Sequence, residues 1–62
     1  MTITLSKDKR GFIHLKSKNP WFEKEYFGDV KIDIFDLFFL MRDISERAYD
    51  EVGEECFFDI IK

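Results

Sequence analysis

The sequence is poor in the residues that build several common classes of protein. Its 62 residues include one cysteine, one histidine and one proline. A single cysteine excludes an internal disulfide and a cysteine-rich zinc site, and no spacing of other ligands suggests a metal or a cofactor. No apolar run is long enough to span a bilayer, and the first residues lack the apolar core of a signal peptide. We therefore expect a cytoplasmic protein with no membrane partner.

The residues that catalysis needs are equally scarce. No glycine-rich phosphate loop is present. A catalytic pair of His14 and Cys56 would also need a third orienting group and an oxyanion hole, and although acidic residues are many, nothing in the sequence indicates an enclosed cleft. A chain of this length rarely encloses both a core and a water-excluding cleft. We expect a protein that is not an enzyme.

Apolar and aromatic residues, in contrast, are plentiful. Hydrophobic residues make up 45% of the chain and aromatic residues 18%, with eight phenylalanines, which excludes a disordered chain. The length allows one domain, residues 1–62, and a chain this short buries only about 60% of the surface that its unfolded form exposes.

Charge divides the chain into two halves. The net charge is −3 and the pI is about 5.0. This composition disfavours a generic basic nucleic-acid binder and argues against direct nucleic-acid binding. Residues 1–31 carry seven Lys/Arg and four Asp/Glu, whereas residues 32–62 carry three and nine. The simplest interpretation is that the acidic residues of 32–62 lie on a helix face in contact with solvent.

Alternating apolar and polar residues over 2–17 predict a β-hairpin that turns at Gly11. Residues 18–32 form an aromatic segment that we expect to be extended, because Pro20 ends the preceding strand. This segment is either one strand bent at Gly28 or a short hairpin that turns at Gly28 and Asp29.

A helical period follows over 33–52, with Asp33 as the N-cap and Gly53 after the last turn. The apolar run over 55–61 predicts a last strand. The expected fold is α+β: a small antiparallel sheet of three or four strands, in the order β-β-(β)-α-β, with one long amphipathic helix packed on one face.

The helix carries more aromatic residues than its core face can use. At 100° per residue one arc forms the core face, with Phe38 at its edge. The arc contains Ile34, Leu37, Met41, Ile44, Ala48 and Val52. Phe35 and Phe39 point about 100–170° away from the centre of this arc. Three explanations stay open: residues 18–32 cover the pair, a second copy of the chain does, or another protein does.

The two Phe side chains and the charges around them form our candidate partner-binding surface, since exposed apolar patches mark interfaces. Its members are Phe35, Phe39, Arg42, Asp43, Glu46 and Asp50. Such a surface could dock on the basic cleft of a nucleic-acid-handling protein, with carboxylates at phosphate positions and a Phe ring in place of a base.

In size, acidity and order of elements, the chain resembles the small phage-encoded inhibitors of host DNA enzymes, among them the uracil-DNA glycosylase inhibitors. The resemblance covers the hairpin, the helix and the last strand, and Lys18 to Lys31 depart from so minimal a layout. It implies a viral protein, a homodimer that presents acids and aromatic rings to a DNA-binding cleft as a DNA mimic.

Two other functions are kept as alternatives. The first is a single-stranded nucleic-acid-binding module, in which cations track phosphates and aromatic rings stack on bases. Its residues would be Lys9, Arg10, Lys16, Trp21 and Tyr26. The second is a structural assembly subunit with no separate target.

Overall fold

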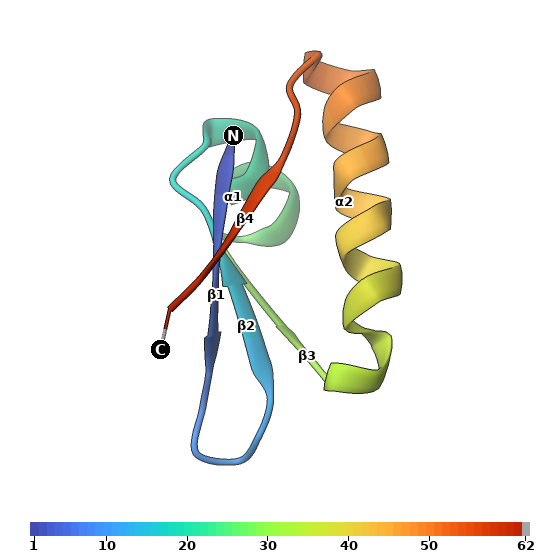
Figure 1. The fold of residues 1–62 in the computed structure, drawn as a ribbon. Helices are drawn as coiled ribbons and strands as arrows, with labels where there is room; N and C mark the ends of the chain where they lie inside the picture. The colour runs from blue at the N-terminus through green and yellow to red at the C-terminus, as the bar shows by residue number, and fades with distance from the viewer. Residues whose placement is uncertain (62) are drawn as a thin grey trace.

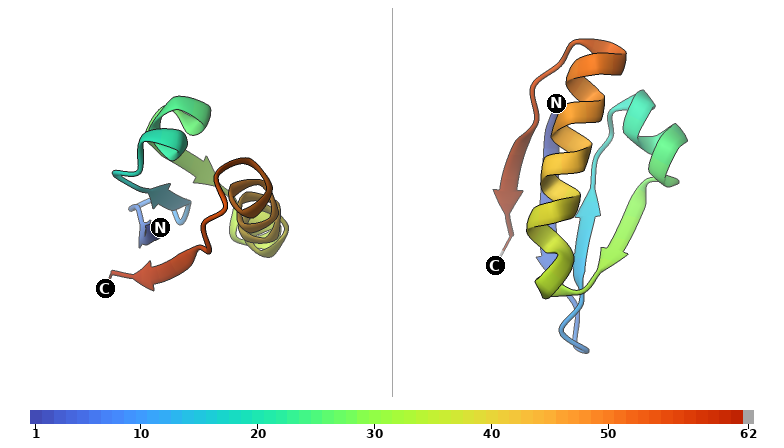
Figure 2. Two further views of the ribbon diagram at one scale, coloured as in Figure 1. Left: turned by 90° about the horizontal axis from the view of Figure 1, so that it is seen from above. Right: turned by 90° about the vertical axis from the view of Figure 1, so that its right-hand side faces the viewer.

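The computed structural model describes residues 1–61 and shows an α+β domain, as predicted, with a four-stranded sheet and one long helix (Figure 1). The elements are, in chain order, β1 (Thr2–Lys7), β2 (Ile13–Lys16), α1 (Pro20–Tyr26), β3 (Asp29–Ile32), the 3-10 helix η1 (Ile34–Asp36), α2 (Leu37–Val52) and β4 (Phe57–Ile60). The long helix crosses one face of the sheet, and the short helix α1 lies beside it (Figure 2).

The sheet is mixed, whereas the sequence predicted an antiparallel one. The strand order is β3-β2-β1-β4. The hairpin β1–β2 and the pair β2–β3 are antiparallel, but β4 runs parallel to β1, with Leu5 opposite Ile60. The reason is the crossover connection through α2. Strand β3 runs in the same direction as β1, and α2 then runs back along the sheet, so β4 starts at the same end as β1 and runs parallel to it.

The predicted hairpin is confirmed, and Asp8 builds its turn. The Asp8 carboxylate accepts hydrogen bonds from the backbone N–H of Arg10 at 2.8 Å and of Phe12 at 3.0 Å. Gly11 follows with φ of 90°, a conformation that glycine adopts at little cost.

The prediction of an extended segment over 18–32 is wrong, because residues 20–26 form α1. The Asn19 side chain caps this helix by accepting hydrogen bonds from the N–H groups of Trp21 and Phe22. Pro20 occupies the first turn, where its missing N–H costs nothing. The helix buries Phe22 completely, and only the short strand β3 follows it.

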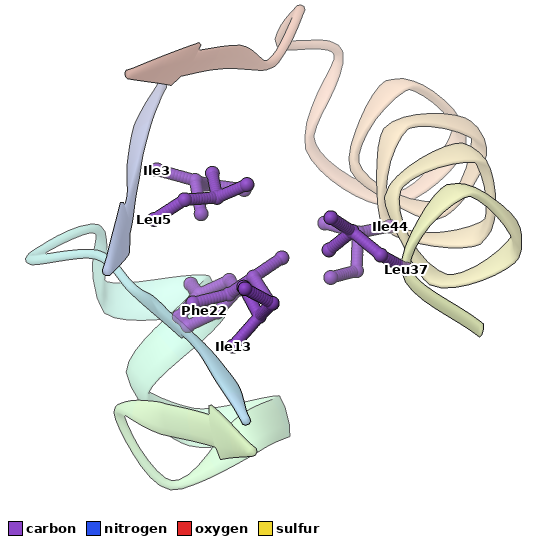
Figure 3. Packing of buried hydrophobic residues seen from close by; sticks show 7 residues of the cluster. Ile3, Leu5, Ile13, Phe22, Leu37 and Ile44 are labelled. Carbon is purple, nitrogen blue, oxygen red and sulfur yellow. The ribbon is translucent and has the colours of Figure 1, made fainter. Parts of the chain in front are cut away.

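The core lies between the inner face of the sheet and the two helices (Figure 3). Its buried residues are Ile3, Leu5, Ile13, Leu15, Phe22, Leu37, Ile44 and Ala48. The predicted core face of the helix is too long at both ends, since Ile34 is 52% and Val52 39% exposed. Ile34 belongs to η1, whose tighter turn changes the direction of its side chains, and Val52 lies in the last turn, beyond the sheet (Figure 1).

The remaining boundaries differ from the predicted ones by a few residues. Asp33 does act as a cap, but on η1, where its carboxylate accepts a hydrogen bond from the N–H of Phe35. The helix ends at Gly53 with φ of 69°, as expected. The last strand covers 57–60 rather than 55–61.

Phe27 joins α1 to β3 in an unusual conformation. Its φ of 55° lies in the left-handed region, and its ring is 93% exposed. A left-handed residue with a Cβ costs about 1–2 kcal/mol, and so exposed a ring gains little from packing. The junction therefore holds strain that a better-suited residue would remove.

We expect Phe27→Asn and Phe27→Gly to raise the free energy of unfolding by about 1 kcal/mol, because both residues tolerate the left-handed region. Phe27→Ala removes the same ring but keeps a Cβ that disfavours this conformation, so it should bring little gain. Urea denaturation followed by circular dichroism measures all three. A Gly variant that is less stable than the Ala variant would show that the conformation is unstrained, because glycine then only adds entropy to the unfolded chain.

Candidate functional site

The described residues expose more large apolar side chains than the core buries. Eight hydrophobic residues are buried, whereas ten large ones are exposed. A monomer rarely leaves so much apolar surface in contact with water without an interaction to use it. The arrangement of the exposed group therefore indicates where this chain meets other molecules.

Three of these side chains form one cluster at the start of the long helix. Phe35, Phe38 and Phe39 are 86%, 77% and 75% exposed, and we call them the aromatic patch. Phe35 lies in η1, about one turn before Phe38 and Phe39 in α2, so the three exposed rings belong to the same end of the helix. The expected exposure of Phe35 and Phe39 is confirmed, and Phe38 joins them because the buried face of the helix is narrower than the sequence indicated.

The alternative that residues 18–32 cover the two Phe side chains is wrong. This segment packs instead against the C-terminal half of α2, where Arg47 donates a hydrogen bond to the Tyr26 hydroxyl at 2.8 Å. The aromatic patch lies at the other end of the helix.

Charged residues continue the outer face of α2 beyond the patch. Arg42, Asp43, Glu46 and Asp50 are all exposed. The one cation of this group is paired, since Arg42 Nε lies 3.3 Å from a Glu46 carboxylate oxygen. All six predicted partner-binding residues thus lie on the outer, solvent-facing side of the α2 region, which combines exposed rings with a net negative charge.

Arg47 holds the two helices together. Its guanidinium lies over the rings of Trp21 and Tyr26, at 5.6 and 5.4 Å from their centroids, and also pairs with Glu51 and Glu25. Glu51 accepts a further hydrogen bond from Trp21 Nε1 at 3.3 Å, which lowers the pKa of its carboxyl group. Cation–π contacts and charged hydrogen bonds thus fix α1 on the flank of α2.

The structure does not bring the five candidate nucleic-acid-binding residues together. Lys9 and Arg10 follow β1 in the hairpin turn, whereas α1, with Trp21 and Tyr26, lies at the other end of the sheet (Figure 1). The centroids of the Trp21 and Tyr26 rings lie 5.8 Å apart, and the guanidinium of Arg47 lies over both rings. Neither ring is therefore free to stack on a base. Lys16 lines a separate shallow depression on the outer face of the sheet.

A charged cluster that the sequence analysis missed joins the hairpin to β3. His14 Nε2 lies 2.9 Å from an Asp8 carboxylate oxygen, and its Nδ1 lies 3.2 Å from one of Asp29. Only a protonated imidazole can donate from both nitrogens. The hydrogen bonds with Asp8 and Asp29 accordingly raise the pKa of His14, and the bond with His14 lowers the pKa of Asp8. Only the strand register could have shown this cluster, because the three residues are far apart in sequence.

Over residues 1–61, no group of histidine, cysteine and acidic side chains has the arrangement of a metal site. The same part of the chain has no helix with the length and apolarity needed to cross a bilayer. No protein-family model, curated protein or solved structure matches this chain. The aromatic patch and its acidic surroundings therefore carry the functional argument alone.

The His14 cluster predicts a pH dependence of stability. Because folding raises the pKa of His14, its contribution is complete below the ordinary value of 6.5 and is lost as the pH rises through the folded value. The contribution of Asp8, whose pKa is lowered, is complete above 3.8 and is lost as the pH falls further. The cluster stabilises the fold most between these two values.

We expect the urea concentration at the midpoint of unfolding to decrease for the wild type as the pH rises from 5.5 to 8.5. The same midpoint should decrease less for His14→Gln. The two proteins share every other ionisable group, so the difference between them isolates the imidazole. Parallel declines would show that the cluster contributes nothing to stability.

Proposed function

We propose that this chain is a small acidic protein-interaction module that binds another protein through the outer face of α2. By occupying a site on that partner, it would inhibit the partner or connect it to further components. The observation that carries this proposal is the exposure of the aromatic patch beside the carboxylates of the same helix. The binding requires no catalysis and no cofactor.

The patch has the features of an interaction hot spot. Aromatic residues contribute much of the binding energy at interfaces, above all when a partner removes them from water. Here the helix that carries them is anchored by Ile44 and Ala48, which are completely buried. The backbone of the patch is therefore held before the partner arrives, which lowers the entropic cost of binding.

The charges favour a basic partner over a second copy of the same surface. Asp43, Glu46 and Asp50 lie on the same face as the rings, and a two-fold contact of the patch with itself would bring like charges together. A basic surface would instead meet complementary charge, which accelerates association and selects the partner.

One class of partner that fits this chemistry is a nucleic-acid-binding enzyme of the cytoplasm. The cleft of such an enzyme has cations that bind phosphates and a pocket that binds a base. The carboxylates of this helix would occupy the phosphate positions, and a Phe ring would occupy the pocket. The role corresponds to that of the phage-encoded inhibitors that the sequence resembles. We rank this role above single-stranded nucleic-acid binding, because Trp21 and Tyr26 are occupied within the fold.

The test uses a synthetic amphipathic helix of leucine and lysine as the probe, with fluorescence anisotropy as the measurement. We expect the chain to bind this peptide but not its counterpart with glutamate in place of lysine. Phe39→Asp should weaken the binding by about tenfold or more, as for a central interface residue.

Phe27→Asp is the matched control, because it replaces another exposed ring outside α2, 93% exposed against 75% for Phe39, by the same charge and should leave the affinity unchanged. Circular dichroism shows whether each variant keeps its helix. Equal binding of the two peptides, or an unchanged affinity in a folded Phe39→Asp variant, contradicts the proposal. If Phe39→Asp unfolds the chain, the ring belongs to the core and the proposal also fails.

A further inference from the structure

Among residues 1–61, strand β4 forms one edge of the sheet and leaves a row of backbone groups unpaired on its outer side. On its inner side, the Phe57 N–H donates to Met1 O at 2.8 Å, and the Ile61 N–H donates to Leu5 O at 2.9 Å. Alternate residues of a parallel strand bond to the same neighbour. The N–H and C=O groups of Phe58 and Ile60 therefore point away from β1, toward the open edge.

This edge has little of the protection with which soluble proteins prevent further pairing, since Asp59 is the only charged residue of β4. Charged residues, especially lysine, proline and bulges are the usual protection. The opposite edge strand, β3, has exposed Asp29 and Lys31. Strand β4 instead exposes Phe57 and Ile60, at 63% and 73%.

The helices cover the two edges of the sheet unequally. Strand β4 lies at one end of the curved sheet, and α1 packs near the other end, where β3 lies (Figure 3). Ile60 pairs with buried Leu5 and so faces the core side of the sheet, yet it stays 73% exposed. The helices therefore leave the core side of the sheet partly uncovered beside β4.

We propose that β4 pairs antiparallel with β4 of a second copy across a two-fold axis, with Phe58 opposite its own counterpart. A strand that pairs with itself supplies both the donors and the acceptors of the new ladder. It also brings the apolar side chains at the open end of one core against those of the other. This pairing uses a surface separate from the aromatic patch, so it holds whether or not the patch binds a basic partner.

Charge selects the register. Residues directly opposite each other must lie on the same face of the sheet, so the two-fold axis has to pass between a residue and its own counterpart. In the middle of β4 this residue is either Phe58 or Asp59, which gives two possible registers. Centring on Asp59 would place two carboxylates in a close pair, with Cα atoms about 4.5 Å apart, which is destabilising. Centring on Phe58 places Ile60 opposite Cys56 and Phe57 opposite Asp59, with no like charges in contact.

Light scattering coupled to size exclusion tests the pairing. We expect a mass of twice 7.5 kDa for the wild type, and half that mass for Ile60→Lys, which adds a protective charge to the edge. Phe39→Lys places the same charge on the aromatic patch and should stay dimeric. A wild type that is monomeric at millimolar concentration overturns the proposal, as does a Phe39→Lys variant that dissociates while Ile60→Lys does not.

Cross-linking tests the register even if Ile60→Lys fails to fold. In Ile60→Cys, each new thiol faces Cys56 of the second copy, so oxidation should give a dimer with two bridges and no free thiol. The reaction needs alkaline pH, because burial raises the pKa of the Cys56 thiol.

The matched control is Cys56→Ser combined with Ile60→Cys. Its two thiols lie four residues apart along the strands, about 13 Å, which is too far for a bridge. We expect this variant to form no cross-link under the same conditions. A cross-linked control, or an Ile60→Cys variant that keeps its free thiols, would exclude the Phe58-centred register.

Discussion

The packing of α2 against the inner face of the sheet is the interaction on which the rest of the structure depends. Ile44 and Ala48 are completely buried there and face strands that contribute Ile3 and Leu15. The same helix carries the chain from β3 to the opposite edge, so it also fixes the parallel direction of β4. A substitution that loosened this contact would therefore remove the core and the crossover together.

One helix is too narrow to cover four strands, and α1 supplies the missing cover on one side only. Its single buried residue, Phe22, completes the core near β3, and Arg47 fixes its position beside α2. No comparable element lies beside β4 in the described residues, where Ile60 stays exposed. The apolar surface of this chain thus has two origins: surplus rings on the outer side of α2, and an uncovered margin of the core beside β4.

The sequence allowed the elements with a long, regular pattern to be predicted, because their period reflects burial directly. The hairpin shows alternation, and the long helix shows a 3.6-residue period that ends at Gly53. The helix α1 escaped prediction because Asn19 and Pro20 are ambiguous: they can end a strand, or they can cap a helix and fill its first turn. The segment has only seven residues, which is too short for its pattern of apolar residues to distinguish a helix from a strand.

The candidate surface was predicted better than the contacts around it. Phe35 and Phe39 could be placed off the core face by helical geometry alone, since the rest of the helix defines that face. The His14 cluster and the Arg47 contacts could not, because they join residues that only the tertiary fold brings together. The direction of β4 likewise follows from the order of the strands in the sheet, which local patterns do not contain.

The two proposed surfaces would reinforce each other. A two-fold axis that pairs β4 with itself is perpendicular to the sheet, so it keeps both copies of α2 on the same face of one continuous sheet. The two aromatic patches would then point in the same direction, one on each copy. A partner with two basic sites, or two partners side by side, would meet both patches at once. The second contact would form at a high effective concentration, so a dimer could bind firmly even where each small patch binds weakly.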